Sequence, residues 1–270
     1  MKPIVKYQGG KTKELPKIKA LLPNQFSRVV EPFCGGAAVT FAFQNTAYIN
    51  DFNAEVINLY NVVANPELFP RLYAAVEELK TYTHNTLETQ FYTARDIINT
   101  PGVTDPYTRA LSYIIVRQLC FSGMERYNSS GAFNVPFGHY QRFSCNLSID
   151  HHTFLKDMCT ITHGTFVDVF PQITATDFVF IDPPYLERLG YTDGDGGLPL
   201  HTQLADCLKH TTAKWMIVHS DHEFYRDTYK EYNIVSNAYV YSQRFGKGKN
   251  HSNAKVEHLY ITNYDTNNFF

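Results

Sequence analysis

The chain has 270 residues, of which 44% are hydrophobic and 19% charged, and its formal net charge is −2. Such values are ordinary for a soluble protein with a substantial core, and they exclude a polycation. The sequence has no run of about 18 apolar residues that could span a membrane, and no signal peptide at its start. It therefore predicts a cytoplasmic protein.

The cysteines and the basic residues are unevenly placed. The five cysteines are far apart and form no C-x-x-C pair, which favours reduced thiols over a disulfide framework or a zinc site. Basic residues gather near the start and near the end of the chain. Local patches of this kind suit nucleic acid, although a basic stretch is also typical of a solvated face.

Four short apolar runs predict buried strands, at residues 28–31, 47–50, 178–181 and 215–218. Helical patterns lie between them, as at residues 54–60. Alternation of this kind predicts an α/β fold with a parallel sheet covered by helices. Ligands of such sheets bind beyond the carboxyl ends of the strands.

The alternation is interrupted from about residue 55 to residue 147. This interval predicts helices at 68–79 and 88–99, and a third that starts with Asp105 as N-cap and Pro106 in the first turn. A polar, turn-rich loop follows at 126–142. We interpret the interval as a smaller domain inserted into the first. Two further runs, at 237–243 and 255–264, predict a C-terminal β-hairpin.

Residues 6–12, KYQGGKT, end like a phosphate-binding P-loop. The P-loop pattern requires a glycine five positions before Gly10, where this chain has Val5. No long hydrophobic strand precedes the segment either. The residues alone therefore disfavour a P-loop and leave the GGK segment unexplained.

The strongest motif is residues 180–185, FIDPPY, in which a hydrophobic strand ends in a carboxylate, two prolines and an aromatic ring. Consecutive prolines stiffen the chain and remove two backbone donors. The carbonyls of Asp182 and Pro183 are left to accept hydrogen bonds from outside. Together these groups suit a planar ligand that carries an NH₂ group, whereas the plain alternative is an ordinary proline turn.

Two other strand ends carry candidate ligand-binding residues. Residues 31–39, EPFCGGAAV, place small residues at a strand-to-helix turn, where a ligand can approach the backbone, although many such turns bind nothing. Asp51 ends the next strand and could accept both hydroxyls of a ribose. Its structural alternative is an N-cap for the helix that starts at Ala54.

Taken together, these motifs resemble the Dam-type family of DNA adenine-N6 methyltransferases (D12 class, alpha group). The resemblance covers nearly the whole chain: the GGK segment, the E-P-F-x-G segment, Asn50-Asp51, RYNSSGAFNVPFG in the insert, the DPPY tetrad and residues 255–259. It implies a Rossmann-like S-adenosylmethionine-dependent methyltransferase sheet with an inserted helical target-recognition domain and a C-terminal β-hairpin. The catalytic domain would be residues 1–54 and 148–270, and the recognition domain 55–147.

The resemblance also implies the roles of residues in methyl transfer. Tyr7 and Lys11 would contact S-adenosylmethionine, Asp51 its ribose and Phe166 its adenine. Asp182 would face both the donor and the target base. The full cofactor set is Tyr7, Gly9, Gly10, Lys11, Glu31, Pro32, Phe33, Gly35, Gly36, Asp51, Phe166 and Asp182, and the catalytic set is Asp182, Pro183, Pro184 and Tyr185. No metal is expected.

One position departs from the family pattern. The family usually has F-x-G-x-G, whereas this chain has Ala37 in place of the last glycine. Alanine is compatible with that position if its φ angle is below zero. This difference from the family pattern is expected to affect the affinity for the cofactor.

Duplex DNA is the implied substrate, with the target adenine flipped onto Tyr185. Arg126 would contact a guanine, as arginine commonly does in the major groove, and the site would be GATC or a close relative. Other expected DNA contacts are Phe121, Ser122, Met124, Pro136, Arg244, Lys247 and Lys249. Asn128 could contact DNA or stabilise its loop. We expect a monomer or weak dimer on DNA, with any cognate restriction endonuclease acting separately.

Other interpretations were weighed against this one. A metal site at His151-His152 or at residues 218–222 lacks a supporting ligand cluster, and Ser220 has no G-x-S-x-G elbow around it. A related methyltransferase acting on RNA or on a protein amide more often has Asn in the place of Asp182. A catalytically idle DNA-binding protein is disfavoured by the intact tetrad. Residues 189–197 are either a lid that orders on DNA or a plain loop.

Overall fold

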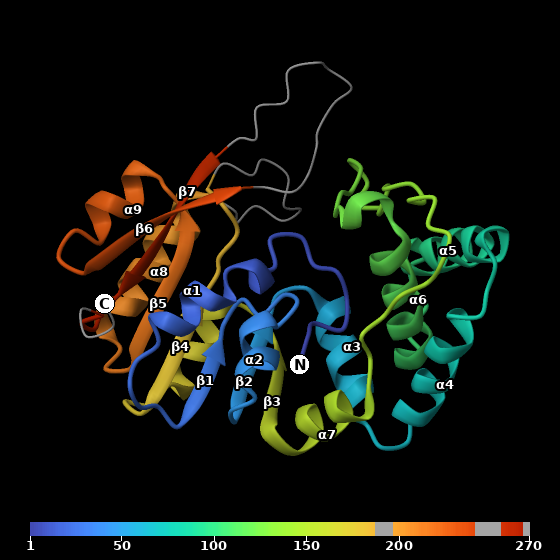
Figure 1. Ribbon diagram of the computed structural model, residues 1–270, viewed down its shortest axis with the longest axis horizontal. Helices are drawn as coiled ribbons and strands as arrows, with labels where there is room; N and C mark the ends of the chain where they lie inside the picture. The colour runs from blue at the N-terminus through green and yellow to red at the C-terminus, as the bar shows by residue number, and fades with distance from the viewer. Residues whose placement is uncertain (187–196, 241–254, 267–270) are drawn as a thin grey trace. The chain divides into compact units, whose positions relative to one another are not determined.

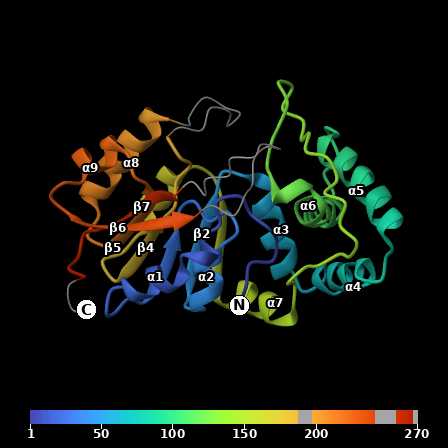
Figure 2. The same cartoon turned by 45° about the horizontal axis from the view of Figure 1, so that its top comes forward.

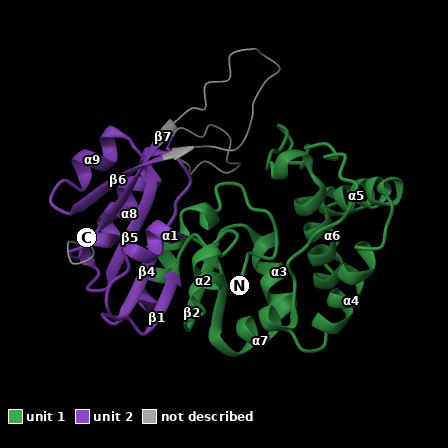
Figure 3. Cartoon of the chain, viewed as in Figure 1, with its two compact units in different colours: residues 1–15, 31–169 green, residues 16–30, 170–270 purple. Residues whose placement is uncertain are grey.

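The computed structural model describes residues 1–186, 197–240 and 255–266. These residues form two compact units, which Figure 3 colours separately. Unit 1 comprises residues 1–15 and 31–169, and unit 2 comprises residues 16–30 and 170–270. The boundaries fall inside secondary structure, so α1 and β1 each have one residue in unit 1.

Unit 1 combines two strands with most of the helices (Figure 1). Its strands β2 and β3 pair in parallel, with Ala47 opposite Cys159 and Asp51 opposite His163. Its elements are β2 (Ala47–Asp51), β3 (Cys159–His163), α2 (Ala38–Phe43), α3 (Ala54–Ala64), α4 (Phe69–Leu79), α5 (His84–Asn99), α6 (Pro106–Leu119) and α7 (Ile149–Met158), with single 3₁₀ turns at Lys11–Lys13 and Phe121–Gly123.

Helix α3 is the central helix of unit 1. It packs against α6, α7 and β3, and α5 lies along α6 (Figure 2). The buried apolar side chains of these helices belong to one hydrophobic cluster, which also includes Ile4 and Val5. Burial of this shared core is what holds the helices together, since short helices are marginal alone.

The helix starts follow local capping chemistry. Asp105 accepts a hydrogen bond from the Thr108 N–H and so caps α6, as predicted. Asn53 caps α3 by accepting from the N–H groups of Glu55 and Val56. The predicted helix at 88–99 begins earlier, at His84.

Unit 2 contains a mixed five-stranded arrangement in the order β1-β4-β5-β7-β6. Strands β1, β4 and β5 are parallel, and β7 is antiparallel to both β5 and β6. The bounds are β1 (Arg28–Glu31), β4 (Asp177–Ile181), β5 (Lys214–Ser220), β6 (Asn233–Val240) and β7 (Lys255–Thr262), with α1 (Leu15–Ala20), α8 (Leu198–His210) and α9 (Glu223–Thr228). The predicted α/β class and the C-terminal hairpin are confirmed, although β6 starts at Asn233.

Strand β4 is buried along its whole length, because apolar residues 178–181 need cover on both faces. Its first residue, Asp177, is held by a two-pronged ion pair with Arg28 of β1, with N···O distances of 3.1 and 2.6 Å. Asp177 also accepts from the Thr174 N–H at 2.8 Å. These bonds fix the register in which β4 delivers the residues that follow it.

The compact units divide the chain differently from the domains expected from sequence. Residues 55–147 lie wholly inside unit 1, together with the first 15 residues and the glycine turn. A separate function for residues 55–147 in target recognition stays a prediction. Among the described residues, none of the helices has both the length and the apolar character needed to cross a bilayer.

Candidate active site and nucleic-acid interface

The ring of Tyr7 lies directly against the glycine turn that follows β1. A Cβ atom at Gly35 would come within 2.6 Å of that ring, and one at Gly36 within 2.9 Å of the Tyr7 Cβ atom. Gly35 also has a φ of +44°, which favours glycine. The predicted cofactor residues Tyr7, Gly35 and Gly36 are therefore packed together, and glycine is required for that approach.

Asp51, at the end of β2, fastens the same turn. Its carboxylate accepts from the Gly35 N–H at 2.7 Å and from the Asn53 N–H at 2.9 Å. Burial raises the pKa of Asp51 to about 6, and the two backbone hydrogen bonds oppose this rise. The proposed alternative role of Asp51 as N-cap of α3 is wrong, because Asn53 fills that position.

Two buried polar residues that the sequence analysis assigned no role brace the turn. Tyr60 donates its hydroxyl to the Gly35 carbonyl at 2.6 Å. Asn50 donates to the carbonyls of Pro32 at 3.1 Å and Gly164 at 3.0 Å. Asn50 could have been identified from the Asn50-Asp51 motif, whereas Tyr60 lies inside a helical pattern and carries no such signal.

The aromatic residues predicted for the cofactor meet in the structure. Phe166 stacks on Phe33 with 5.2 Å between ring centroids. The Asn50 bond to Gly164 holds the chain just before Phe166. Phe52, beside Asp51, is 60% exposed although it is a large apolar residue.

Glu31 and Lys11 are both buried, and both bond to nearby backbone groups. Glu31 accepts from the Thr40 N–H at 2.7 Å, in the first turn of α2. Lys11 donates to the Gly9 carbonyl at 2.9 Å. Both contacts stabilise the backbone of turns that flank Tyr7. Glu31 and Lys11 therefore help to hold the shape of the site.

Ala37 does not meet the condition set for it from sequence. Its φ is +50°, in the left-handed region, and not below zero. A side chain in this conformation costs roughly 1–2 kcal/mol relative to glycine. The residue is nevertheless fully buried, so its methyl group offsets part of this cost through packing.

Unit 1 has a pocket of about 340 Å³ near the GGK segment, lined in part by Tyr7, Gly10 and Gly36. Asp51 and Phe166 do not line it, so the predicted cofactor set does not converge on this one cavity. The chemistry of the set still fits a nucleoside-bearing donor. The half-buried carboxylate of Asp51 suits ribose hydroxyls, and stacked aromatic rings suit a purine.

The DPPY tetrad follows β4 in unit 2. Pro183 is buried, whereas Asp182 and Tyr185 are half-buried. The Tyr185 ring meets the edge of His219 with 5.0 Å between centroids, at an interplanar angle of 87°. It also meets His258 at 6.1 Å. The tetrad thus rests on imidazole rings from β5 and β7.

A second layer of rings supports these imidazoles. His219 stacks on Tyr225 at 4.1 Å, and the Tyr225 hydroxyl lies 2.6 Å from Nδ1 of His201. Burial lowers the pKa of His201 to about 4, so this imidazole is neutral at neutral pH. Of the histidines in residues 218–222, which were considered as metal ligands, His219 packs against Tyr185.

The residues predicted to contact DNA cluster at the end of α6. Phe121, Ser122 and Pro136 are exposed, and the Phe121 N–H donates to the Pro136 carbonyl at 2.9 Å. Arg126 is also exposed, and Asn134 holds its guanidinium through two bonds of 2.7 and 3.2 Å. The guanidinium is therefore pre-oriented, which lowers the entropic cost of a bidentate contact.

Asn128 stabilises the loop that it belongs to. Its side-chain oxygen accepts from the N–H groups of Ser130 and Ala132 and from the Ser130 hydroxyl, at 2.7–3.0 Å. This is the local role that was weighed for it, and a role in DNA contact stays a prediction.

Several predicted features lie outside the described residues. These are Arg244, Lys247, Lys249 and most of the segment 189–197. His151 and His152, weighed as metal ligands, each approach a backbone carbonyl, those of Lys2 and Val63. Within the described ranges, no group of three acidic, histidine or cysteine side chains could hold a metal ion.

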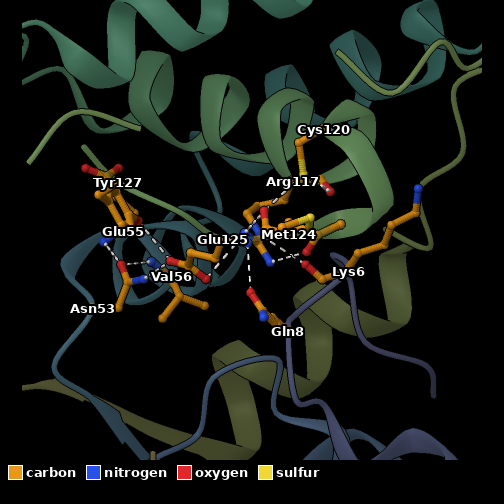
Figure 4. A network of polar contacts seen from close by, with 11 residues as sticks. Lys6, Gln8, Asn53, Glu55, Val56, Arg117, Cys120, Met124, Glu125 and Tyr127 are labelled. Carbon is orange, nitrogen blue, oxygen red and sulfur yellow. Dashed lines mark hydrogen bonds and ion pairs between the residues drawn. The ribbon is translucent and has the colours of Figure 1, made fainter. Parts of the chain in front are cut away.

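A buried charge cluster was missed by the sequence analysis (Figure 4). Arg117 of α6 is 1% exposed and pairs with Glu125 at 3.3 Å. Glu125 in turn contacts Gln8, Asn53 and Tyr127. Arg117 lies in the helical run 106–119, and no motif in the sequence marks it as buried.

Comparison with known proteins assigns the family. Residues 7–243 match the family model of the D12 class N6 adenine-specific DNA methyltransferases. The type II methyltransferase M.CviBI of Paramecium bursaria Chlorella virus NC1A is 31% identical over 98% of this chain and 100% of its own length. M1.LlaDCHI of Lactococcus lactis subsp. cremoris is 28% identical over 98% and 96%. A DNA adenine methylase of Serratia marcescens is 32% identical over 67% and 66%.

The chain therefore belongs to the D12 class of N6 adenine-specific DNA methyltransferases. It is an adenine-specific DNA methyltransferase with the α/β methyltransferase fold, and DNA is its substrate. The resemblance noted from the sequence motifs is confirmed.

Proposed function

We propose that this enzyme transfers a methyl group from S-adenosylmethionine to N6 of an adenine flipped out of duplex DNA, within GATC or a closely related site. The observation that carries the proposal is the tetrad at the end of β4. A fully buried strand delivers Asp182-Pro183-Pro184-Tyr185, and two imidazole rings hold the aromatic member.

Adenine N6 is a poor nucleophile because its lone pair is delocalised into the ring. The Asp182 carboxylate and the Pro183 carbonyl accept hydrogen bonds from the two N–H groups of the adenine. These hydrogen bonds localise the lone pair on N6 and stabilise the positive charge that develops on nitrogen. S-adenosylmethionine, when bound, supplies an electrophilic methyl group on a sulfonium. The bond from N6 to the methyl carbon forms as the bond from that carbon to sulfur breaks, S-adenosylhomocysteine leaves, and the nitrogen releases one proton to solvent. No covalent enzyme intermediate is needed.

Tyr185 is the residue that receives the flipped base. An adenine inside a duplex cannot reach a carboxylate on the protein, so the base must leave the stack. Tyr185 is half-buried, and the rings beneath it keep its orientation. Stacking on that ring offsets part of the cost of unpairing.

Unit 1 supplies the donor-binding groups. The Asp51 carboxylate accepts the ribose hydroxyls, and the Phe33–Phe166 pair packs on the adenine of the donor. These roles are supported by Asn50, which precedes Asp51 in the chain. Its side-chain amide donates hydrogen bonds to the carbonyls of Pro32 and Gly164 and so holds the segments that carry Phe33 and Phe166. The braced backbone keeps Asp51 and Phe166 in a fixed relation.

Arg126 specifies the target through a guanine. The hydrogen bond to Asn134 orients the exposed guanidinium of Arg126. Arginine is the commonest bidentate partner of guanine O6 and N7. The basic residues Arg244, Lys247 and Lys249 would bind phosphates and make binding salt-dependent. The enzyme would act in the cytoplasm, as a monomer or weak dimer on DNA. Because the relatives above include type II methyltransferases, a separate cognate endonuclease is part of the proposal.

Labelled methyl transfer tests the proposal. Purified protein is incubated with S-adenosylmethionine labelled in the methyl group and with a GATC duplex, a duplex lacking the site, RNA or protein. Transfer to the GATC duplex alone is expected, and sequencing should then find N6-methyladenine at GATC. A different methylated context would discard the proposed site. Specific binding without transfer at saturating cofactor would instead support an idle DNA-binding protein.

A further inference from the structure

The buried ion pair of Arg117 and Glu125 joins the GGK segment to the recognition segment, defined here as residues 121–127. Arg117 donates to the carbonyls of Lys6 at 3.1 Å, Gly123 at 3.2 Å and Met124 at 3.3 Å. One guanidinium thus holds the residue before Tyr7 and two residues of the recognition segment (Figure 4).

Glu125 makes the reciprocal connections. Its N–H donates to Oε1 of Gln8 at 2.8 Å, and its carboxylate accepts from the Tyr127 hydroxyl at 2.8 Å and from the Asn53 amide at 3.4 Å. Gln8 follows Tyr7 in the chain, and the Asn53 N–H bonds Asp51. Gln8 and Asn53, two of the neighbours of Glu125 outside the recognition segment, therefore adjoin predicted donor-binding residues.

The pair behaves as one unit because the Arg117 side chain is only 1% exposed and depends on Glu125, which is 14% exposed, for its counter-charge. Removing one partner of a buried ion pair exposes the other to the full desolvation penalty. If the recognition segment moves with all these hydrogen bonds intact, Gln8 and Asn53 must move with it. If it moves without them, several hydrogen bonds must break together.

We propose that Gln8, Arg117 and Glu125 are positioning residues that couple recognition of the target site to binding of the methyl donor. The inference rests on the proposed function, and it adds that each ligand raises the affinity for the other. Coupling of this kind is reciprocal, and it is typically about 5- to 150-fold.

The measured quantity is the ratio of two dissociation constants for S-adenosylhomocysteine, an unreactive probe. Calorimetry gives one constant without DNA and one with a saturating duplex that carries the site found by sequencing. Gln8→Met removes the acceptor of the Glu125 N–H without touching the ion pair. Glu125→Gln removes the charge and keeps the shape. The matched control is Gln118→Met, a buried glutamine of α6 that bonds the Ile4 carbonyl instead.

We expect a wild-type ratio of about five or more, which falls towards one in Gln8→Met and Glu125→Gln and is unchanged in Gln118→Met. Simple bracing would shift both constants and the melting temperature but keep the ratio. A wild-type ratio of one, or an unchanged ratio in both variants, overturns the inference while the enzyme still methylates DNA. Should Glu125→Gln not fold, Gln8→Met alone decides. Failure of the wild type to bind the probe or to methylate would instead refute the proposed function and the inference with it.

Discussion

The turn after β1 and the turn after β4 each follow a buried strand, yet different forces hold them. Polar groups hold the glycine turn: Asp51, Asn50 and Tyr60 all bond its backbone. The tetrad turn is stiffened by its prolines and rests on rings, chiefly His219 and His258. The glycine turn should be most sensitive to substitutions that remove a hydrogen bond or add atoms. The tetrad turn should be most sensitive to substitutions that remove a ring.

The largest effect is expected at Asp182. Asp182→Ala removes an acceptor of the adenine amino group, so methyl transfer should fall by about 10³-fold or more while DNA affinity is largely retained. Asp182→Asn keeps a side-chain oxygen that can accept the hydrogen bond but removes the negative charge, so methyl transfer should fall by less than in Asp182→Ala. Single-turnover methylation and a DNA-binding titration measure both quantities. Near-normal turnover in Asp182→Ala would eliminate the mechanism.

Gly35→Ala should produce the next largest effect. The added methyl group would meet the Tyr7 ring at 2.6 Å and would force it off the turn. We expect the dissociation constant of S-adenosylmethionine to rise by about 100-fold, equivalent to about 2.7 kcal/mol. Gly102→Ala is the matched control, because Gly102 also has a positive φ but has no atoms near a new Cβ and lies outside the predicted cofactor set. Equal losses in both variants would assign the effect to backbone strain and not to Tyr7.

Asp51→Asn tests the polar bracing and its pH dependence. One side-chain amide cannot accept from both the Gly35 and the Asn53 N–H groups, so cofactor affinity should fall by about 10-fold or more. The folded pKa of Asp51 is raised from 3.8 to about 6, so the folded state binds a proton more tightly than the unfolded state does. Its contribution to the free energy of unfolding must therefore fall as pH rises through that window.

Urea unfolding of both proteins across the same pH range measures this contribution. The wild type should lose stability relative to Asp51→Asn as pH rises from about 4 to about 6. A pH-independent difference between the two proteins would contradict the raised pKa.

His219 tests the ring support of the tetrad. His219→Ala removes the ring against which Tyr185 packs, and kcat should fall by about 10-fold with little change in DNA affinity. His219→Phe keeps a ring of similar size and should recover most of that loss. Fluorescence of 2-aminopurine at the target position would report base stacking in parallel. A phenylalanine variant as slow as the alanine variant would show that the imidazole acts chemically.

The smallest effect is expected at Ala37. Ala37→Gly relieves a φ of +50° but deletes a buried methyl group, and these contributions oppose each other. The net change in the free energy of unfolding should stay within about 1 kcal/mol, measured by urea unfolding. A larger gain would mean that the strained backbone, and not packing, dominates at the glycine turn.

Local sequence chemistry predicted much of this fold. Strands β1, β2, β4 and β5 follow short apolar runs, and Asp105-Pro106 starts α6 where its side chain can cap the helix. Strand β3 was not predicted, because its polar and half-buried residues lack an apolar run. Helix α7 was not predicted either, and Ser148 at its N-cap makes no side-chain capping bond that would mark its start.

The sequence by itself determined the motifs, their order and thus the family, because each motif depends on neighbouring residues whose chemistry is local. Only the tertiary structure decided that Ala37 has a positive φ and that Arg117 is buried against Glu125. Burial, which gives a buried charge or a strained backbone its cost, arises from the packing of residues far apart in the chain and is not visible in a local pattern.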